Sequence, residues 1–226
     1  IVGYIGAQPA APFLIEGLTR LEYRGYDSAG IAVLGTSRTT RVRTVGRVRA
    51  LEASLPKRLN GKVGIGHTRW ATHGPAEERN AHPHISADGR ISVVHNGIID
   101  NAASVRAQLQ ADGVEFSSDT DTEVLAHLIA RSDATTLEAA VLKTLGRVTG
   151  TYALAVIDEQ HPERVVVARS GSPLIIGVGE KEMFVASDVA ALVRHTRQVV
   201  FLADGELATL TAAGYEGSRL GPPTTV

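Results

Sequence analysis

Short apolar runs rich in Val, Ile and Ala recur along the chain, and each is bounded by Gly, Asp, Ser or Pro. Runs of this kind predict β-strands. Apolar and polar residues alternate in 41–45, which predicts one face in water, whereas 152–157 is apolar throughout and predicts burial on both faces. The predicted strands are residues 1–6, 29–34, 39–45, 62–67, 91–96, 151–158, 164–168, 173–178, 183–186, 197–202 and 205–211.

Longer segments with helical spacing lie between these runs. Gly113 is placed to end one helix as its C′ residue. Thr120–Glu123 has the spacing of a capping box for the next helix, and Ser187–Asp188 reads as an N-cap. The predicted helices are residues 9–21, 47–58, 101–111, 121–132, 135–147 and a short one at 188–193.

Many short strands with helices before and between them predict an α+β protein. Several strands follow one another through tight turns, which favours antiparallel pairing. Two sheets packed face to face, with helices outside, would bury the strands that are apolar on both faces. No repeat of 20–50 residues interrupts this pattern.

Composition narrows the function classes. The 226 residues suffice for one sheet-rich domain. A net charge of −1 and a pI near 6.8 argue against a nucleic-acid partner. No run of 18 apolar residues exists, so we expect no membrane span. The absence of Cys excludes disulfides and thiolate metal sites within these residues and fits a cytoplasmic protein.

Both ends of the sequence suggest a longer parent protein. The chain opens on a buried-looking strand without an initiator methionine, and 221–226 is rich in turn residues and poor in apolar ones. We therefore expect residues ahead of Ile1 and interpret 218–226 as the start of a linker.

Two polar, glycine-rich loops, 22–30 and 67–74, follow or precede predicted strands and are the first candidates for chemistry. Arg69, near the end of a strand, could hold a carboxylate with two hydrogen bonds. The alternatives are that Arg69 makes a surface ion pair and that Trp70 covers an edge of the core.

Five histidines, His67, His73, His82, His84 and His95, fall in one window. A metal site is one interpretation, but Cys is absent and no HExxH spacing occurs. Hydrogen bonds from imidazoles to loop backbone are the interpretation we favour. No metal is therefore expected.

Asn96 and Gly97 end a predicted strand. An Asn amide beside a Gly backbone N–H offers two donors that could stabilise an oxyanion. An ordinary Asn-Gly turn is the alternative.

Other polar residues have similar alternatives. Asp121 at a helix start could receive an ammonium group or simply favour the helix dipole. Ser170 and Ser172 could be nucleophiles, but neither lies in a G-x-S-x-G elbow, and a turn explains them equally.

These motifs occur together in one known family. From Ile1 to about Gly217 the chain resembles the glutaminase domain of the glutamine–fructose-6-phosphate aminotransferases, a branch of the class II amidotransferases. The motifs that carry the resemblance, all in the family's order, are 21–30, 67–74, 80–84, 95–99, 120–123 and 168–176.

The resemblance implies a fold and a nucleophile. The fold is that of the N-terminal-nucleophile hydrolases, a four-layer α-β-β-α sandwich of two antiparallel sheets, with the domain spanning 1–217. The nucleophile is an N-terminal Cys followed by Gly. Because Ile1 falls where the family's third residue stands, we expect Cys-Gly ahead of Ile1.

The resemblance also assigns roles in glutamine binding. Arg69 should pair with the α-carboxylate of L-glutamine, and Asp121 should hold its α-ammonium group. Thr72 and His73 belong to the loop that closes over glutamine.

Further roles concern the reaction itself. The Asn96 side chain and the Gly97 N–H should form the oxyanion hole. Trp70 should gate ammonia passage, and Arg24 should border the nucleophile.

The family also implies partners and a parent reaction. Ammonia would pass to fructose 6-phosphate in a C-terminal sugar isomerase domain, giving glucosamine 6-phosphate without a cofactor or metal. The whole enzyme would be a homodimer through that domain. Two alternatives stay open: a glutamine-binding regulatory module without a nucleophile, and a hydrolase that uses Ser170, Ser172 or the histidines.

Overall fold

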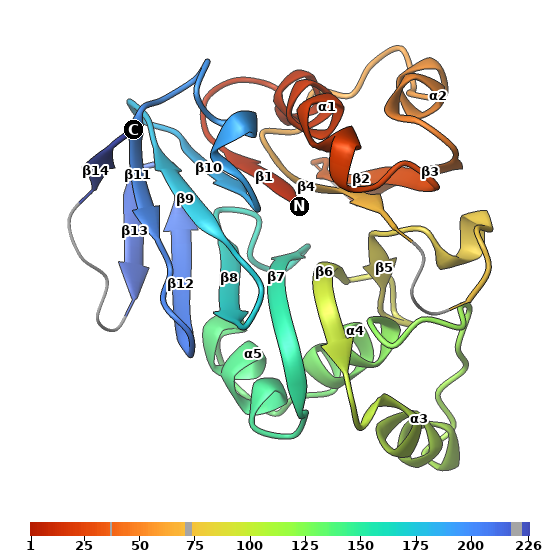
Figure 1. Ribbon diagram of the computed structural model, residues 1–226. Helices are drawn as coiled ribbons and strands as arrows, with labels where there is room; N and C mark the ends of the chain where they lie inside the picture. Colours follow the sequence, from red (N-terminus) through yellow and green to blue (C-terminus); the bar gives the residue numbers. More distant parts are fainter. Residues whose placement is uncertain (37, 71–73, 218–222) are drawn as a thin grey trace.

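The computed structural model describes residues 1–36, 38–70, 74–217 and 223–226. Two antiparallel sheets pack face to face (Figure 1). The first sheet has the order β14 (Thr224–Thr225), β11 (Gln198–Phe201), β9 (Ile175–Val178), β10 (Met183–Ala186), β1 (Val2–Ile5), β4 (Val63–Arg69), β2 (Ser28–Leu34) and β3 (Thr39–Val45). The second has the order β13 (Gly214–Gly217), β12 (Glu206–Thr211), β8 (Val165–Ser170), β7 (Gly150–Asp158), β6 (Ile91–Ile99) and β5 (His84–Ile85).

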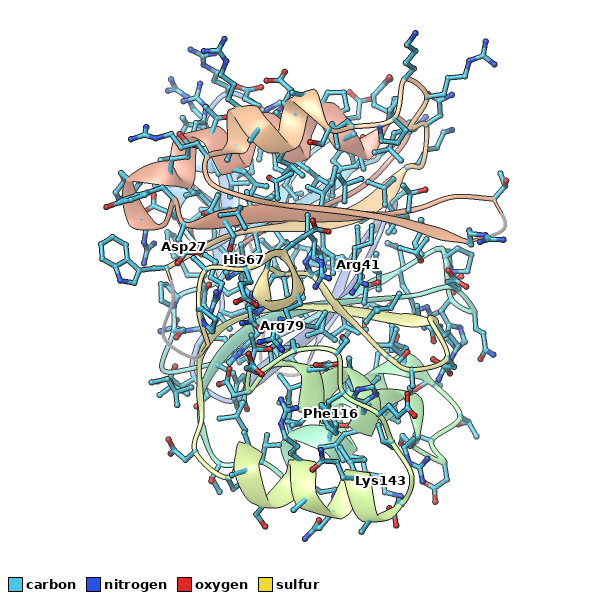
Figure 2. The ribbon with its side chains drawn as sticks, turned by 90° about the vertical axis from the view of Figure 1, so that its right-hand side faces the viewer. Asp27, Arg41, His67, Arg79, Phe116 and Lys143 are labelled. Carbon is cyan, nitrogen blue, oxygen red and sulfur yellow. The ribbon has the colours of Figure 1, made fainter. Side chains whose placement is uncertain are left out.

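Helices cover the outer face of each sheet. α1 (Ala10–Leu21) and α2 (Val48–Ala53) lie on the first sheet, and α3 (Ala102–Ala111), α4 (Glu123–Ala130) and α5 (Leu137–Leu145) on the second. Figure 2 shows these four layers edge-on. The predicted four-layer α-β-β-α arrangement of antiparallel sheets is confirmed. Three short 3₁₀ helices complete the described elements: η1 (Glu22–Arg24), η2 (Glu78–Asn80) and η3 (Val189–Ala191).

Apolar residues fill three layers of core. Ile65, Val94 and Val167 belong to the cluster between the two sheets. Separate clusters join α1 and α2 to the first sheet and α3, α4 and α5 to the second. Side chains alternate along β1, so Tyr4 packs with the helices and Ile5 with the central layer. Both faces of the central strands are buried, which explains their continuous apolar runs.

Most predicted elements match the structure, and two predictions at helix ends are confirmed. α3 ends in a Schellman motif at Gly113, whose φ is +82°, with Gly113 N–H donating to Gln110 O and Val114 N–H to Leu109 O. Asp188 is the N-cap of η3 and accepts from Ala190 N at 2.9 Å.

Other predictions were wrong. The helix expected over 47–58 is only Val48–Ala53, and the strand expected over 91–96 continues to Ile99. The capping box fails because Thr122, rather than Thr120, is the N-cap of α4. Glu123 turns instead to the preceding loop, where its carboxylate accepts from the N–H groups of Ser117 and Ser118 at 2.8 and 2.7 Å.

The last residues take part in the first sheet, since β14 pairs with β11. The interpretation of 218–226 as the start of a linker stays a prediction. In the described part of the chain, no helix is both long and apolar enough to cross a membrane.

Candidate active site

A cavity of about 210 Å³ lies between the two sheets near the start of β1, with a lining that includes Ile1, His67 of β4 and Asn96 of β6. Its wall combines residues from distant parts of the chain, so the fold rather than any local motif assembles it. The lining residues are Ile1, Leu21, Arg24, His67, Thr68, Arg69, Trp70, His82, His95, Asn96, Gly97, Thr120, Asp121, Thr122, Ser172, Pro173 and Ser187.

One wall is built around the first residue of the described chain. The Ile1 nitrogen donates to Ser187 Oγ at 3.1 Å, and Ser187 N–H donates to Ile1 O at 3.0 Å. Arg24 donates to Ser187 O at 3.1 Å and pairs with Asp188 at 3.6 Å. The Ile1 nitrogen and the Arg24 guanidinium are therefore held on the same short segment at the edge of the cavity.

Arg69 ends β4 and is buried, with 3% of its surface exposed. Its guanidinium donates to Gly74 O at 3.0 Å and to Pro75 O at 3.1 Å, which ties the following loop to the strand. The surface-ion-pair alternative is wrong, because Arg69 is buried and lines the cavity.

Trp70 is 60% exposed, and its ring meets Tyr26 edge-on at 5.5 Å. The alternative that Trp70 covers an edge of the core is therefore wrong. It stands at the cavity mouth, where its apolar ring is available for contact. Thr72 and His73 lie outside the described residues.

Asn96 and Gly97 lie inside β6, opposite Ala153 and Tyr152 of β7. The Asn-Gly turn alternative is wrong. Gly97 has a φ of +126°, and a Cβ there would lie 2.1 Å from Thr151 O, so only glycine fits without strain. The strand thus places the Asn96 side chain and the backbone of Gly97, which no side chain covers, next to each other at the cavity.

Asp121 is 8% exposed and lies one residue ahead of the N-cap of α4. Its Oδ2 accepts from Ile99 N at 2.8 Å, which fixes the carboxylate beside the end of β6. Arg106 holds the same segment by donating to Ser118 O and Thr120 O at 3.0 and 2.6 Å. A buried carboxylate and a buried guanidinium thus line one cavity.

The four described histidines of the window are buried: His67, His82 and His95 line the cavity, and His84 lies next to His82. His67 and His82 stack at 4.1 Å, and His82 meets His84 edge-on at 4.7 Å. The expected bonds to loop backbone are mostly wrong for these four histidines. His95 Nε2 contacts Thr151 O at 3.3 Å, but each of the four imidazoles meets a side chain. These contacts are His67–Asn96, His82–Thr122, His84–Thr120 and His95–Thr122, at 2.8 to 3.0 Å.

A metal site would need some of these histidines to be grouped with other ligands. Among the described residues no group of three or more His, Cys, Asp or Glu side chains is arranged to hold a metal ion. The serine alternative also lacks a base: Ser172 lines the cavity but no described imidazole bonds its hydroxyl, and Ser170 lies outside the lining. Within 1–36, 38–70, 74–217 and 223–226, neither hydroxyl is hydrogen-bonded to a base that could activate it as a nucleophile.

Burial keeps three of these imidazoles neutral. It lowers the pKa of His67 and His82 well below the ordinary value and lowers the pKa of His84 to about 3. Below pH ~6.5 the unfolded chain binds protons at these residues and the folded chain does not, so stability falls as pH falls.

We therefore expect the free energy of unfolding to drop by about 2.4 kcal/mol between pH 7.5 and pH 6.0, roughly 0.8 kcal/mol for each of the three histidines. Urea unfolding at the two pH values measures the change. The His82→Leu variant should lose about a third of it. An equal free energy of unfolding at both pH values would contradict the assignment.

Some residues that line the cavity had no role in the site predicted from the sequence: Thr68, Thr120, Thr122 and Ser187. Three others, His82, His95 and Ser172, were named only in the metal-site and serine-nucleophile alternatives. The sequence did point to some of these positions: Thr120 and Thr122 lie in the family motif 120–123, and Ser172 lies in the motif 168–176. The resemblance gave these side chains no role. For Ser187 the only signal was a helix N-cap, and its contact with Ile1 joins residues far apart in the sequence.

Comparison with known proteins identifies the family. Residues 57–219 match a family model described as a glutamine amidotransferase domain. The chain is 51% identical over 215 residues to a glutamine–fructose-6-phosphate aminotransferase of Symbiobacterium thermophilum and 50% identical over 228 residues to one of Mycolicibacterium smegmatis. Each match covers 95% of this chain. The chain spans 35% and 36% of these relatives, about a third of their length.

Solved structures of other proteins have the same fold as this chain. A glutamine phosphoribosylpyrophosphate amidotransferase from B. subtilis superposes with a TM-score of 0.82 at 30% identity, covering 96% of this chain and 48% of that one. A glutamine aminotransferase class-II domain protein from Silicibacter pomeroyi, at 18% identity, shares the fold with a TM-score of 0.62 over 98% of this chain and 99% of that one. The chain has the N-terminal-nucleophile hydrolase fold and belongs to the glutamine amidotransferase domain family.

Proposed function

We propose that this domain hydrolyses L-glutamine to L-glutamate and ammonia in the cavity at Ile1. One observation carries the proposal: Arg69, Asp121, Asn96 and Gly97 line the same cavity, together with Ile1. Glutamine has a carboxylate and an ammonium group on its α-carbon and an amide at the far end. The cavity offers a cation, an anion and amide donors to match them.

Binding would rest on the two buried charges. Arg69 holds the α-carboxylate, for which its planar guanidinium provides two parallel donors. Asp121 holds the α-ammonium group while its Oδ2 keeps the bond from Ile99 N–H. A ligand with only one of the two charges would leave a buried group of the site uncompensated, so the pair selects an amino acid.

The chemistry would begin with a Cys two residues ahead of Ile1, as the resemblance implies. Its thiolate attacks the side-chain amide carbon, and its α-amino group, acting through water, relays the proton to the departing ammonia. The C–N bond breaks and a glutamyl thioester forms. Water then cleaves the thioester, releasing glutamate and restoring the thiol. Asn96 Nδ2 and Gly97 N–H stabilise the oxyanion in both halves of the reaction.

In the longer protein the ammonia would pass to fructose 6-phosphate and yield glucosamine 6-phosphate. The second substrate would bind a C-terminal sugar isomerase domain that follows residues 1–217 and a linker from 218, and that domain would form the homodimer. Trp70, exposed at the cavity mouth, would guide ammonia toward it. Arg24 would hold the Ser187 segment against the nucleophile. Thr72 and His73 would close over bound glutamine.

The test is glutamine hydrolysis by the chain with Cys-Gly joined ahead of Ile1. We expect glutamate and ammonia in equal amounts, and no measurable turnover when Ala replaces that Cys. Calorimetric titration with glutamine runs beside the assay. Glutamine binding without hydrolysis by the Cys form would overturn the proposal and favour the regulatory module.

A further inference from the structure

The side-chain amide of Asn96 meets a buried imidazole from the opposite sheet. Asn96 Oδ1 lies 2.8 Å from Nε2 of His67, which belongs to β4 and is 4% exposed. Asn96 belongs to β6, so the contact crosses the space between the sheets, where Figure 2 labels His67. The partners of a terminal amide decide which way its oxygen and nitrogen point.

The tautomer of His67 decides the orientation of the Asn96 side-chain amide. Burial lowers the pKa of His67 well below its ordinary value, so the ring is neutral and carries one N–H. Its Nδ1 is buried and has no hydrogen-bond partner among the described residues. A proton there would be an orphaned buried donor, which costs about 1–3 kcal/mol. The proton therefore sits on Nε2, and its acceptor must be the oxygen of the Asn96 amide.

The neighbouring side chains hold the ring in this position. His82 stacks on His67 at 4.1 Å, and His82 Nε2 contacts Thr122 Oγ1 at 3.0 Å. Thr122 Oγ1 also contacts His95 Nδ1 at 2.8 Å. The other nitrogen of His95 contacts the acceptor Thr151 O, so His95 Nδ1 accepts from Thr122, which leaves Thr122 Oγ1 to accept from His82.

We propose that His67 is a positioning residue: its Nε2–H holds Asn96 Oδ1, so that Asn96 Nδ2 points its two N–H donors into the cavity. The inference rests on the proposed hydrolysis of glutamine and deepens it. With a hydrophobic residue at 67 the amide could rotate, and for part of the time its oxygen would face the developing oxyanion. Preorganisation of that donor would be lost, while the groups that bind glutamine would be untouched.

The experiment compares His67→Leu, His67→Gln and His127→Leu in the chain with Cys-Gly ahead of Ile1. For His67→Leu we expect kcat to fall by ~10-fold or more, short of the ~10²–10³-fold loss for removing an oxyanion donor, with KM for glutamine unchanged. His67→Gln should regain most of the rate, because its amide N–H can reach Asn96 Oδ1. His127 is equally buried, at 2% exposed, but outside the cavity lining, so His127→Leu should lose stability and keep kcat.

A double-mutant cycle separates positioning from a structural role. If His67 acts through the amide, His67→Leu has no further effect on kcat in an Asn96→Ala background. Additive losses, an unchanged kcat in His67→Leu, or an equal loss in His127→Leu would each overturn the inference. A parent chain without glutaminase activity would instead overturn the proposed function, so the two failures are distinguishable.

Discussion

Replacing Asp121 with Asn should raise the KM for glutamine about 100-fold or more and leave kcat within a few-fold of the parent. The change removes the only charge that Asp121 offers a ligand ammonium group, and breaking a buried charge pair costs about 2–5 kcal/mol. The amide oxygen of Asn can still accept from Ile99 N–H, so the end of β6 keeps its anchor. Steady-state glutaminase kinetics measure both constants.

The control for Asp121 is a substrate rather than a second variant. Glutaramate has the amide and carboxylate of glutamine but lacks the α-ammonium group. The parent chain should strongly prefer glutamine to glutaramate, and Asp121→Asn should lose most of that preference. If both substrates lose the same factor in kcat/KM, Asp121 acts through the structure of the site and the assignment is wrong.

The Asn96→Ala change should lower kcat about 10²–10³-fold with little change in KM. Its amide is proposed to donate to the oxyanion, a charge that exists only once the thiolate has attacked, so the loss falls on the transition state. The substitution also leaves His67 Nε2–H without its acceptor, which should cost about 1–3 kcal/mol of stability. Rates are therefore compared at a temperature where circular dichroism shows both proteins folded.

An aldehyde analogue of glutamine checks the Asn96 assignment independently. The nucleophile adds to the aldehyde and forms a tetrahedral adduct that carries the same oxygen. Its affinity should fall by the same factor as kcat/KM in Asn96→Ala, while the affinity for the product glutamate stays unchanged. Equal weakening of aldehyde and glutamate binding would contradict a role in the oxyanion hole.

Hydrophobic patterning predicted the layers well because both faces of the central strands are buried. It failed to predict strand residues where the strand pairing continues through segments that have few apolar residues. Gly214–Gly217 forms β13 without a single Val or Ile. Asn96-Gly97 reads locally as a turn, yet Gly97 fits inside β6 because its missing Cβ admits the Thr151 carbonyl. Tertiary pairing decided these segments, and no local preference encodes it.

The arrangement of the site was harder to predict from the residues alone than the fold was. From the residues alone Arg69 could be a carboxylate-binding group or a surface charge, because only the fold shows that it is buried and donates to two loop carbonyls. Glu123 has capping-box spacing, but its carboxylate accepts hydrogen bonds from the backbone N–H groups of Ser117 and Ser118 instead of capping the helix. Family motifs named some of the groups that line the cavity, among them Arg69, Asn96 and Asp121. They could not reveal the contact between His67 and Asn96, which depends on the packing of one sheet against the other.

The most direct test of a glutamine-hydrolysing cavity at Ile1 is the intact mass of the chain with Cys-Gly ahead of Ile1 after incubation with a diazoketone analogue of glutamine. We predict the mass increase of one covalent adduct, prevented by excess glutamine and absent when Ala replaces the Cys. No adduct on the Cys form, or an adduct on the Ala form as well, would contradict a Cys-dependent glutaminase site.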